Sequence, residues 1–279
     1  MKQMCLFFIL ALMVFSANSY AGLEDGLVSV WNFDDGTAND AVGDNDGEFM
    51  NGASTTDAEF GMALNLDNPE NPATGENTGQ YVEIPSSSSL EKEDGVFSVS
   101  LWVYVRPGGG RNHSAMFFKG DKVGWGAHFF VRMCTTNATN MTWGSCWEGA
   151  EGWFATDNVY AEDEWVHVAY VVDGSEAKAY VTSSVTGDTV IPASGQDNPK
   201  AITTPLLTFP ERPVELGVGR QVGGNAGNDF WIDGMIDEVY FWERALSEDE
   251  VRDLAGGASV VAVEAQGKLA TTWAQVKKR

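Results

Sequence analysis

The stretch that decides the fold is Trp165-Val-His-Val-Ala-Tyr-Val-Val-Asp-Gly174, followed by Ala177-Lys-Ala-Tyr-Val181. Residues of different type alternate along its first half, as they do in a β-strand whose two faces meet different surroundings. Asp173-Gly174 is typical of a tight turn, and a second β-prone run follows the turn. The stretch therefore predicts a β-hairpin.

Similar alternation recurs on both sides of this hairpin. It is clearest in Phe97–Val105, where the odd-numbered residues are apolar and share one face. A capping box formed by Ser247 and Glu250, with Gly256-Gly257 as a stop, predicts one helix. The pattern predicts an all-β fold, a two-sheet antiparallel jelly-roll sandwich with one short late helix. Other predicted strands are Leu27–Phe33, Glu48–Gly52, Ala63–Leu66, Tyr81–Ile84, Ala115–Lys119, His128–Met133, Val214–Gly219 and Phe230–Trp242.

The N-terminal segment has the features of a secretory signal. Lys2 precedes the apolar run Cys5–Phe15, and Ser19-Tyr-Ala21 fits a small-x-small cleavage site. The run is short for a membrane span, so removal after about Ala21 is expected rather than anchoring. We therefore predict a secreted protein, extracellular or periplasmic, with a signal in residues 1–21 and one domain in residues 22–257.

Residues 258–279 form the predicted C-terminal tail. Leu269, Trp273 and Val276 have helical spacing, and the chain ends in three cations. The tail could be an amphipathic helix that docks on the domain, a sorting or attachment tag, or a frayed terminus.

The chain is strongly acidic, with a formal net charge of -23. Such a surface argues against nucleic acid and anionic membranes as partners. After the signal, no segment is long and apolar enough to span a membrane. Many of the acidic groups are expected to be solvated surface, but they also offer oxygen ligands for a hard cation such as calcium.

Two cysteines remain after the signal. Cys134 and Cys146 flank a polar, turn-prone stretch, and an even number of cysteines in an oxidising compartment favours a disulfide across the base of a hairpin. The alternative is two separate buried thiols.

Several blocks of the sequence, in this order, resemble laminin G-like domains, which are jelly rolls of the concanavalin A-like lectin/glucanase superfamily. The resemblance spans about Leu27 to Leu254 and implies a binding module. It does not extend to the segment Cys134–Trp153, so the binding loops cannot be inferred from the family. Besides the hairpin, the blocks are Val30-Trp-Asn-Phe-Asp34 with Asp46-Gly47, Tyr81-Val-Glu-Ile-Pro85, Phe97-Ser-Val-Ser-Leu-Trp-Val103, and Gly234-Met-Ile-Asp-Glu-Val239 with Arg244-Ala-Leu-Ser247.

A calcium ion is the expected cofactor. Asp34, Asp40, Asp44 and Asp46 crowd one loop, and calcium takes six to eight oxygens from carboxylates and carbonyls. The resemblance implies a structural ion held by Asp34, by Asp46 and Gly47, and by Asp237. Alternatively, the Asp and Asn residues of the loop serve turn formation alone.

An enzyme is the less favoured alternative. A glycosidase on this fold needs paired acids, most compactly Glu-x-Asp-x-Glu on one strand, and that spacing does not occur. Asp233 and Asp237 fall on one strand face, but Met235 stands between them. No nucleophile elbow is present.

Exposed aromatic residues are the expected ligand contacts. Trp125, Trp143, Trp147 and Trp153 cluster near the cysteines, and indole faces stack on sugar rings. They could instead pack around the predicted disulfide hairpin. We predict a secreted, non-catalytic module that binds carbohydrate or glycoprotein. A structural or adhesion protein that binds another protein, and a glycoside hydrolase, are the alternatives.

Overall fold

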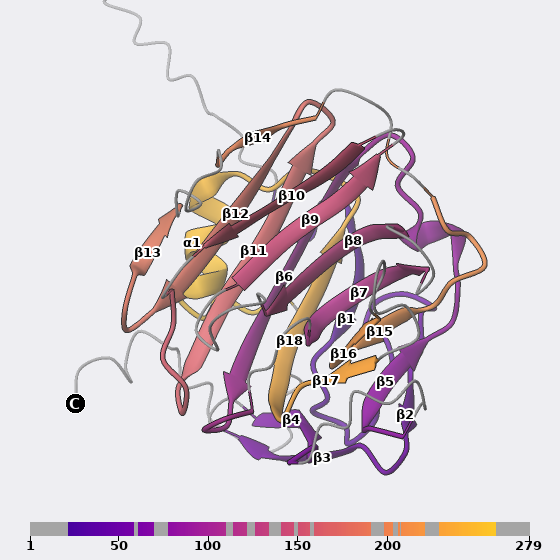
Figure 1. Cartoon of the computed structure of the whole chain (residues 1–279), viewed down its shortest axis with the longest axis vertical. Coiled ribbons are helices and arrows are strands. Elements are labelled where there is room, and N and C mark those ends of the chain that lie inside the picture. Colours follow the sequence, from indigo (N-terminus) through magenta and orange to yellow (C-terminus); the bar gives the residue numbers. More distant parts are fainter. Residues whose placement is uncertain are drawn as a thin grey trace, which may run out of the picture.

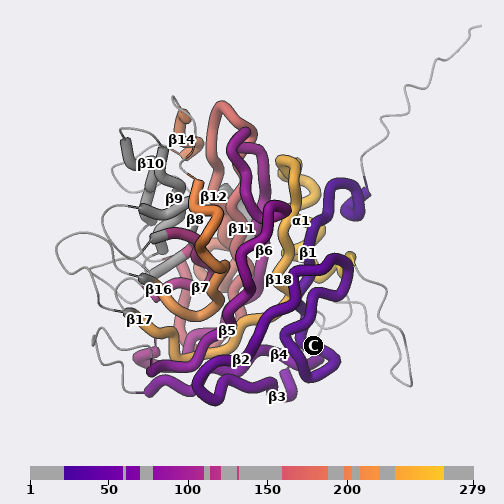
Figure 2. Tube along the Cα trace, turned by 90° about the vertical axis from the view of Figure 1, so that its right-hand side faces the viewer, coloured from indigo at the N-terminus to yellow at the C-terminus, as the bar shows by residue number. Residues whose placement is uncertain are grey.

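Two antiparallel sheets pack face to face with the hydrophobic core between them, and helix α1 (Glu248–Ala255) lies against the outer face of the larger sheet (Figures 1 and 2). This all-β sandwich confirms the predicted fold class. It is seen in a computed structural model, which describes residues 22–58, 61–69, 78–109, 114–121, 126–133, 141–147, 150–156, 159–190, 198–202, 206, 208–220 and 229–260. The predicted signal and residues 261–279 of the predicted tail lie outside this range.

The larger sheet has nine strands. Its order is β13-β12-β11-β6-β18-β4-β3, with β1 also paired to β18 and β14 to β12. The bounds are β13 Gly187–Val190, β12 Glu176–Ser183, β11 Trp165–Asp173, β6 Val96–Val105, β18 Gly234–Trp242, β4 Gly61–Leu66, β3 Ser54–Ala58, β1 Leu27–Trp31 and β14 Lys200–Ala201.

The smaller sheet has seven strands in the order β10-β9-β8-β7-β15-β5-β2. A separate two-stranded ribbon and a single 3-10 turn, η1 (Ser88–Leu90), complete the described elements. The bounds are β10 Ala150–Thr156, β9 Met141–Trp147, β8 Gly126–Met133, β7 Ala115–Asp121, β15 Val214–Leu216, β5 Tyr81–Ile84 and β2 Glu48–Met50, with β16 Val218–Arg220 and β17 Asp229–Trp231 in the ribbon.

The predicted hairpin is β11 and β12. Val172 pairs with Ala177, and Gly174 adopts a φ of 87°, which a side chain would disfavour. The Asp173 carboxylate accepts hydrogen bonds from the main-chain amides of Ser175 (2.9 Å) and Glu176 (2.8 Å), which fixes the turn. The turn chemistry thus sets the strand register.

Strand β6 shows the predicted division of faces. Its apolar residues Phe97, Val99, Leu101, Val103 and Val105 all belong to the core between the sheets. The alternate residues face outward, where one end of the nine-stranded sheet is covered by α1. That helix buries Val251 and Leu254 against the outer-face residues Ala169, Tyr240 and Trp242.

Helix α1 begins at the predicted capping box. The Ser247 side chain accepts from the Glu250 amide, and the Glu250 side chain accepts from the Ser247 amide. The Arg244 guanidinium also donates to both Glu250 oxygens, at 2.6 and 3.0 Å. No helix in the described part of the chain is long and apolar enough to cross a membrane.

The predicted strand Phe230–Trp242 is wrong as one element. It divides into β17 and β18, because Asp233 between them binds the Arg106 guanidinium at 2.7 Å instead of continuing a ladder. Strand β18 also contains a bulge between Asp237 and Tyr240, where Glu238 has a φ of 49°. This bulge shapes the first candidate site.

Candidate functional site

Three carboxylates lie near one another where the neighbour of β18 changes from β1 to β4. Asp34 follows β1, and Asp237 and Glu238 occupy the β18 bulge. Asp237 is only 1% exposed, and its Oδ1 accepts from the Glu238 amide at 2.8 Å. The Met62 amide donates to Asp34 at 2.9 Å. The bulge therefore places the buried Asp237 and the partly buried Glu238 near the exposed Asp34.

The electrostatics of this acidic cluster, Asp34, Asp237 and Glu238, are unfavourable without a cation. Burial, the charge of Glu238 and that of Asp34 raise the pKa of Asp237 well above its usual range. Burial, followed by the charge of Asp34, raises the pKa of Glu238 to about 7. Within the described ranges, no Lys, Arg or His forms an ion pair with any of the three. Buried like charges are costly unless they are protonated or bind a metal.

The three acids of the cluster have the chemistry to bind an oxygen-ligated cation, but they do not form a complete coordination shell by themselves. Among the described residues, no three His, Cys, Asp or Glu side chains converge closely enough to hold a metal by themselves. Calcium also accepts main-chain carbonyls and tolerates irregular geometry. Asp34, Asp237 and Glu238 would supply the charge at such a site, with carbonyl oxygens completing it.

The Asp-rich loop before β2 is held mainly by turn chemistry. The Asp40 carboxylate accepts from the amides of Val30, Val42 and Asn45, and Asp46 accepts from the Asp40 amide. The predicted ligand Gly47 packs elsewhere, since a Cβ there would lie 2.8 Å from Val82 of β5. The structure thus brings the predicted ligands Asp34 and Asp237 together, whereas Asp46 and Gly47 make their described contacts inside the loop and against β5.

The second candidate site lies on the outer face of the nine-stranded sheet, at the end that α1 does not cover. Trp165 of β11 is paired with Tyr104 of β6, which is paired with Met235 of β18. All three side chains are half-exposed. The ring centroids of Trp165 and Tyr104 are 5.7 Å apart, with an interplanar angle of 56°. We call these three residues the aromatic platform.

Polar groups border the aromatic platform. The Tyr104 hydroxyl donates a hydrogen bond to the exposed Asp163, and this bond is the main reason that the pKa of Tyr104 is raised. On the other side, the Arg106 guanidinium donates to Asp233 and to the Leu66 carbonyl, both at 2.7 Å. The platform thus combines apolar ring faces with fixed hydrogen-bonding groups.

Buried groups support the aromatic platform from the next row of the sheet. His167 pairs with Trp102, and their ring centroids are 5.2 Å apart. Nε2 of His167 lies 2.7 Å from Ser100 Oγ, and burial lowers the pKa of His167 to about 3. A neutral, enclosed imidazole at this position is a structural element of the sheet.

A row of glutamates crosses the outer face of the seven-stranded sheet. Glu83 of β5 pairs with Glu215 of β15 on one side and with Glu48 of β2 on the other. Their neighbours in the strands, Val82 and Val214, point into the core. Directly opposed residues have Cβ atoms about 4.5–5.5 Å apart. The register therefore assembles acids from three strands that no single-strand pattern would reveal.

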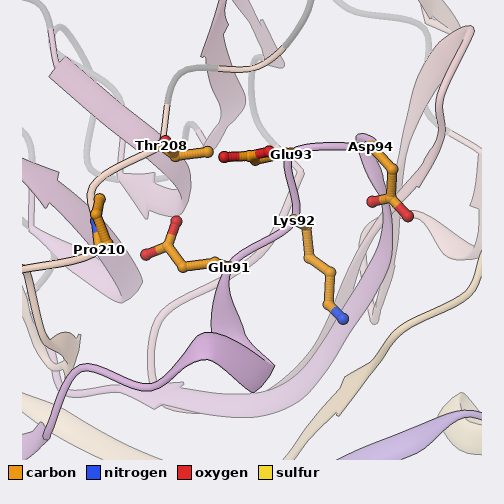
Figure 3. Close-up of a pocket in the computed structure, with 6 residues that line it drawn as sticks. All are labelled: Glu91, Lys92, Glu93, Asp94, Thr208 and Pro210. Atoms are coloured by element: carbon orange, nitrogen blue, oxygen red, sulfur yellow. The ribbon is translucent and has the colours of Figure 1, made fainter.

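One open depression of about 380 Å³ lies beside the segment that leads into β6 (Figure 3). The Glu91 side chain at its edge forms an ion pair of 2.8 Å with the fully buried Lys119, whose pKa is lowered by burial. Lys92 turns away from the depression toward Glu243 (3.6 Å). The lining residues are Glu91, Lys92, Glu93, Asp94, Thr208 and Pro210.

Comparison with protein families identifies the chain. The model of a laminin G family, described as the concanavalin A-like lectin/glucanases superfamily, matches residues 76–252, more than half of the chain. The chain belongs to this superfamily. The match confirms the resemblance found in the sequence. No curated protein matches the chain significantly.

Solved structures of the superfamily fold include several similar to this chain. Domain 4 of a GH43 extracellular arabinanase from Geobacillus stearothermophilus, in complex with arabinotriose, has a TM-score of 0.56 and 21% identity, covering 82% of this chain and 98% of that one. The binding domain of Paraclostridial mosquitocidal protein 1 has a TM-score of 0.58 and 14% identity, covering 84% and 52%. The binding domain of botulinum neurotoxin DC in complex with SialylT has values of 0.53 and 10%, covering 85% and 52%. This chain thus spans about half of the two toxin domains, and at these identities the likeness shows the fold alone.

The predicted tryptophan cluster falls largely on two strands of the smaller sheet. Trp143 and Trp147 lie on β9 and Trp153 lies on β10, whereas Trp125 lies outside the described residues. A ligand site at Trp125, Trp143, Trp147 and Trp153 stays a prediction.

The predicted disulfide also stays a prediction. Cys134 lies outside the described residues and follows Met133, which pairs with Met141 at the start of β9. Cys146 is near the opposite end of β9, where it pairs with Glu151.

Sequence reasoning missed Glu238 and the aromatic platform. The dipeptide Asp237-Glu238 would normally place its acids on opposite faces of a strand, and only the bulge brings both toward Asp34. Trp165 and Tyr104 both lie in predicted strands, but their pairing depends on the register of β11 against β6.

Proposed function

We propose that the protein is a non-catalytic binding module for carbohydrate, stabilised by one calcium ion. The observation that carries this proposal is the aromatic platform, because Trp165 and Tyr104 are half-exposed on a rigid sheet and bordered by polar groups. Aromatic faces combined with a few fixed polar groups are the usual means of orienting a sugar. Recognition would require no covalent step.

The fold relatives are consistent with this proposal. One is described in complex with arabinotriose and another in complex with SialylT. These statements concern those proteins, but they illustrate that the sandwich can present a sugar-binding surface. Secretion, as the N-terminal segment predicts, would place this module where extracellular glycans are available.

The calcium part of the proposal rests on the acidic cluster. Asp237 is buried beside two other acids, and no described cationic side chain neutralises them. A calcium ion would remove this repulsion and tie β18 to the segment after β1. Its role would be structural, because it would hold the β18 bulge, two residues from Met235 of the aromatic platform, against the segment after β1.

A glycan array tests the carbohydrate-binding function directly. Purified protein without the signal is applied, with calcium present, to an array of neutral and anionic polysaccharides and oligosaccharides. We expect saturable binding to a subset and no release of reducing ends from bound material. An array with no bound glycan would reject the proposal.

Glycoside hydrolysis is a second candidate, favoured by the glutamate row. Glu83 and Glu215 are directly paired across strands, which allows their carboxyl groups to reach the separation of about 5–5.5 Å that a retaining glycosidase needs. Against it, Glu215 is only 5% exposed and the Tyr81 hydroxyl donates to Glu83. Release of reducing ends by the wild type but not by Glu83→Gln would establish this activity, whereas equal release or none would dismiss it.

A further inference from the structure

We infer that the aromatic platform binds neutral glycans, with one sugar ring stacked on Trp165 and a sugar hydroxyl donating to Asp163. This inference rests on the proposed carbohydrate-binding function and assigns it a site and a ligand class. The assigned surface lies on the outer face of the nine-stranded sheet, away from the four tryptophans that the sequence suggested.

The geometry favours a sugar over a flat apolar partner. The Trp165 and Tyr104 rings are tilted by 56° to each other, so together they do not form one flat surface. The larger indole face can stack on one face of a sugar ring while the Tyr104 ring contacts its edge. Met235 extends the apolar floor beside Tyr104.

Polar groups at the rim suit hydroxyl recognition. Asp163 is exposed and already accepts one hydrogen bond, from the Tyr104 hydroxyl. A carboxylate has about four acceptor positions, so it retains capacity for sugar hydroxyls. Asp163 is fixed by its own backbone, because its amide donates to the Val105 carbonyl at 2.9 Å.

The charge of this surface selects the ligand class. Glu162, Asp163 and Glu164 are consecutive immediately before β11, and the whole chain has a net charge of -23. Arg106, the nearest cation on this face, is engaged with Asp233 and Asn65. A sialylated or uronate-containing glycan would be repelled, whereas a neutral one would not.

The platform is rigid, so binding would cost little reorganisation. The neighbouring row contains Trp102, which is 9% exposed, and the fully enclosed pair His167 and Ser100. Both Trp165 and Tyr104 stand on long central strands, β11 and β6, that are paired along their whole length. Preorganised aromatic contacts of this kind concentrate binding energy in a few side chains.

The experiment uses calorimetric titration with the neutral oligosaccharide that binds best on the array, and with a sialylated or uronate oligosaccharide of similar length as the anionic probe. The variants are Trp165→Ala, Trp165→Leu, which keeps bulk without an aromatic face, and Asp163→Asn. The control is Val42→Ala, an apolar residue that is 48% exposed in the Asp-rich loop before β2. Thermal melts confirm that each variant is folded.

We expect both Trp165 variants to weaken neutral-glycan binding by at least about tenfold, Asp163→Asn to weaken it less, and Val42→Ala to leave it unchanged. Unchanged affinity in Trp165→Leu, or tighter binding of the anionic probe, would overturn the site or its ligand class while leaving the carbohydrate-binding function intact. Failure of the wild type to bind any glycan would reject both proposals.

Discussion

Nε2 of His167 lies 2.7 Å from Oγ of Ser100, across β11 and β6, in a position where the imidazole is sealed from solvent. Burial lowers the pKa of His167 from 6.5 to about 3. Its Nδ1 has no hydrogen-bond partner among the described residues. Between a pH of about 6.5 and a pH of about 3, this histidine is therefore neutral in the folded protein but protonated in the unfolded chain.

This difference predicts acid sensitivity. Below a pH of about 6.5 the unfolded chain binds a proton that the folded protein does not accept until the pH approaches about 3, so stability is lost as the pH falls between these values. We expect His167 to account for a loss on the order of 3–5 kcal/mol in the free energy of unfolding over this range. Urea unfolding at a series of pH values measures it.

The control for this prediction removes both polar partners. The double variant Ser100→Ala/His167→Leu leaves no orphaned group in the pair, and its stability should depend less on pH than that of the wild type. Parallel pH profiles for the two proteins would contradict the assigned role of His167.

In the acidic cluster, Asp237→Asn is expected to raise the stability of the calcium-free protein and to abolish its stabilisation by calcium. Asp237→Asn removes a buried charge beside Asp34 and Glu238, so the calcium-free protein should become more stable, yet the stabilisation by calcium should disappear. For the wild type, a calcium concentration of about 100 times Kd should add about 2.7 kcal/mol. Melts after chelation, with and without calcium, measure both effects.

Asp44→Asn is the matched control for the metal. Asp44 is exposed in the same acidic loop, outside the cluster, so its variant should keep the full calcium response. A response lost equally in Asp44→Asn and Asp237→Asn would mean that the ion is attracted by the loop as a whole.

At Gly234 the strands β18 and β6 lie so close together that a side chain there should destabilise the protein. A Cβ at this position would lie 2.2 Å from the Tyr104 carbonyl oxygen, a main-chain atom that cannot move aside. We expect Gly234→Ala to cost at least about 2 kcal/mol and to weaken glycan binding, because it displaces Tyr104. Gly256→Ala, where the nearest atom is 3.3 Å away, should cost much less. Equal effects in the two variants, measured by urea unfolding, would refute the close-approach argument.

For the ion pair between Glu91 and Lys119, we expect the loss of stability to depend on whether one partner or both are replaced. Glu91→Ala leaves Lys119 buried without its counter-ion and should cost about 3–5 kcal/mol. The double variant Glu91→Leu/Lys119→Met should recover most of that loss. Glu176→Ala, which breaks the exposed pair with Lys178, should cost less than about 1 kcal/mol. Chemical denaturation checks all three, and a double variant no more stable than Glu91→Ala would contradict the prediction.

Local sequence signals were sufficient for the elements with local causes. The alternation in Phe97–Val105 predicted both faces of β6, and Asp173-Gly174 predicted the β11–β12 turn. Ser247 and Glu250 predicted the start of α1. Each of these depends on neighbours within a few residues, so the information is present in the sequence itself.

Strand boundaries were predicted less well where a distant partner intervenes. The single strand expected at Phe230–Trp242 is interrupted because Asp233 binds Arg106, which lies far away in the sequence. Asp237 was expected among the calcium ligands, but Glu238 was not, because nothing local announces the bulge that places both acids near Asp34.

The sequence by itself determined the all-β architecture, the central hairpin and the late helix, because side-chain periodicity, turn residues and helix caps act over short distances. Tertiary structure alone decided which side chains share a site. Trp165 meets Tyr104, Glu83 meets Glu215, and Asp34 meets Asp237 only through cross-strand register and one bulge. Register is set by the packing of the whole sandwich, since a shift of one residue would turn every side chain of a strand to the opposite face.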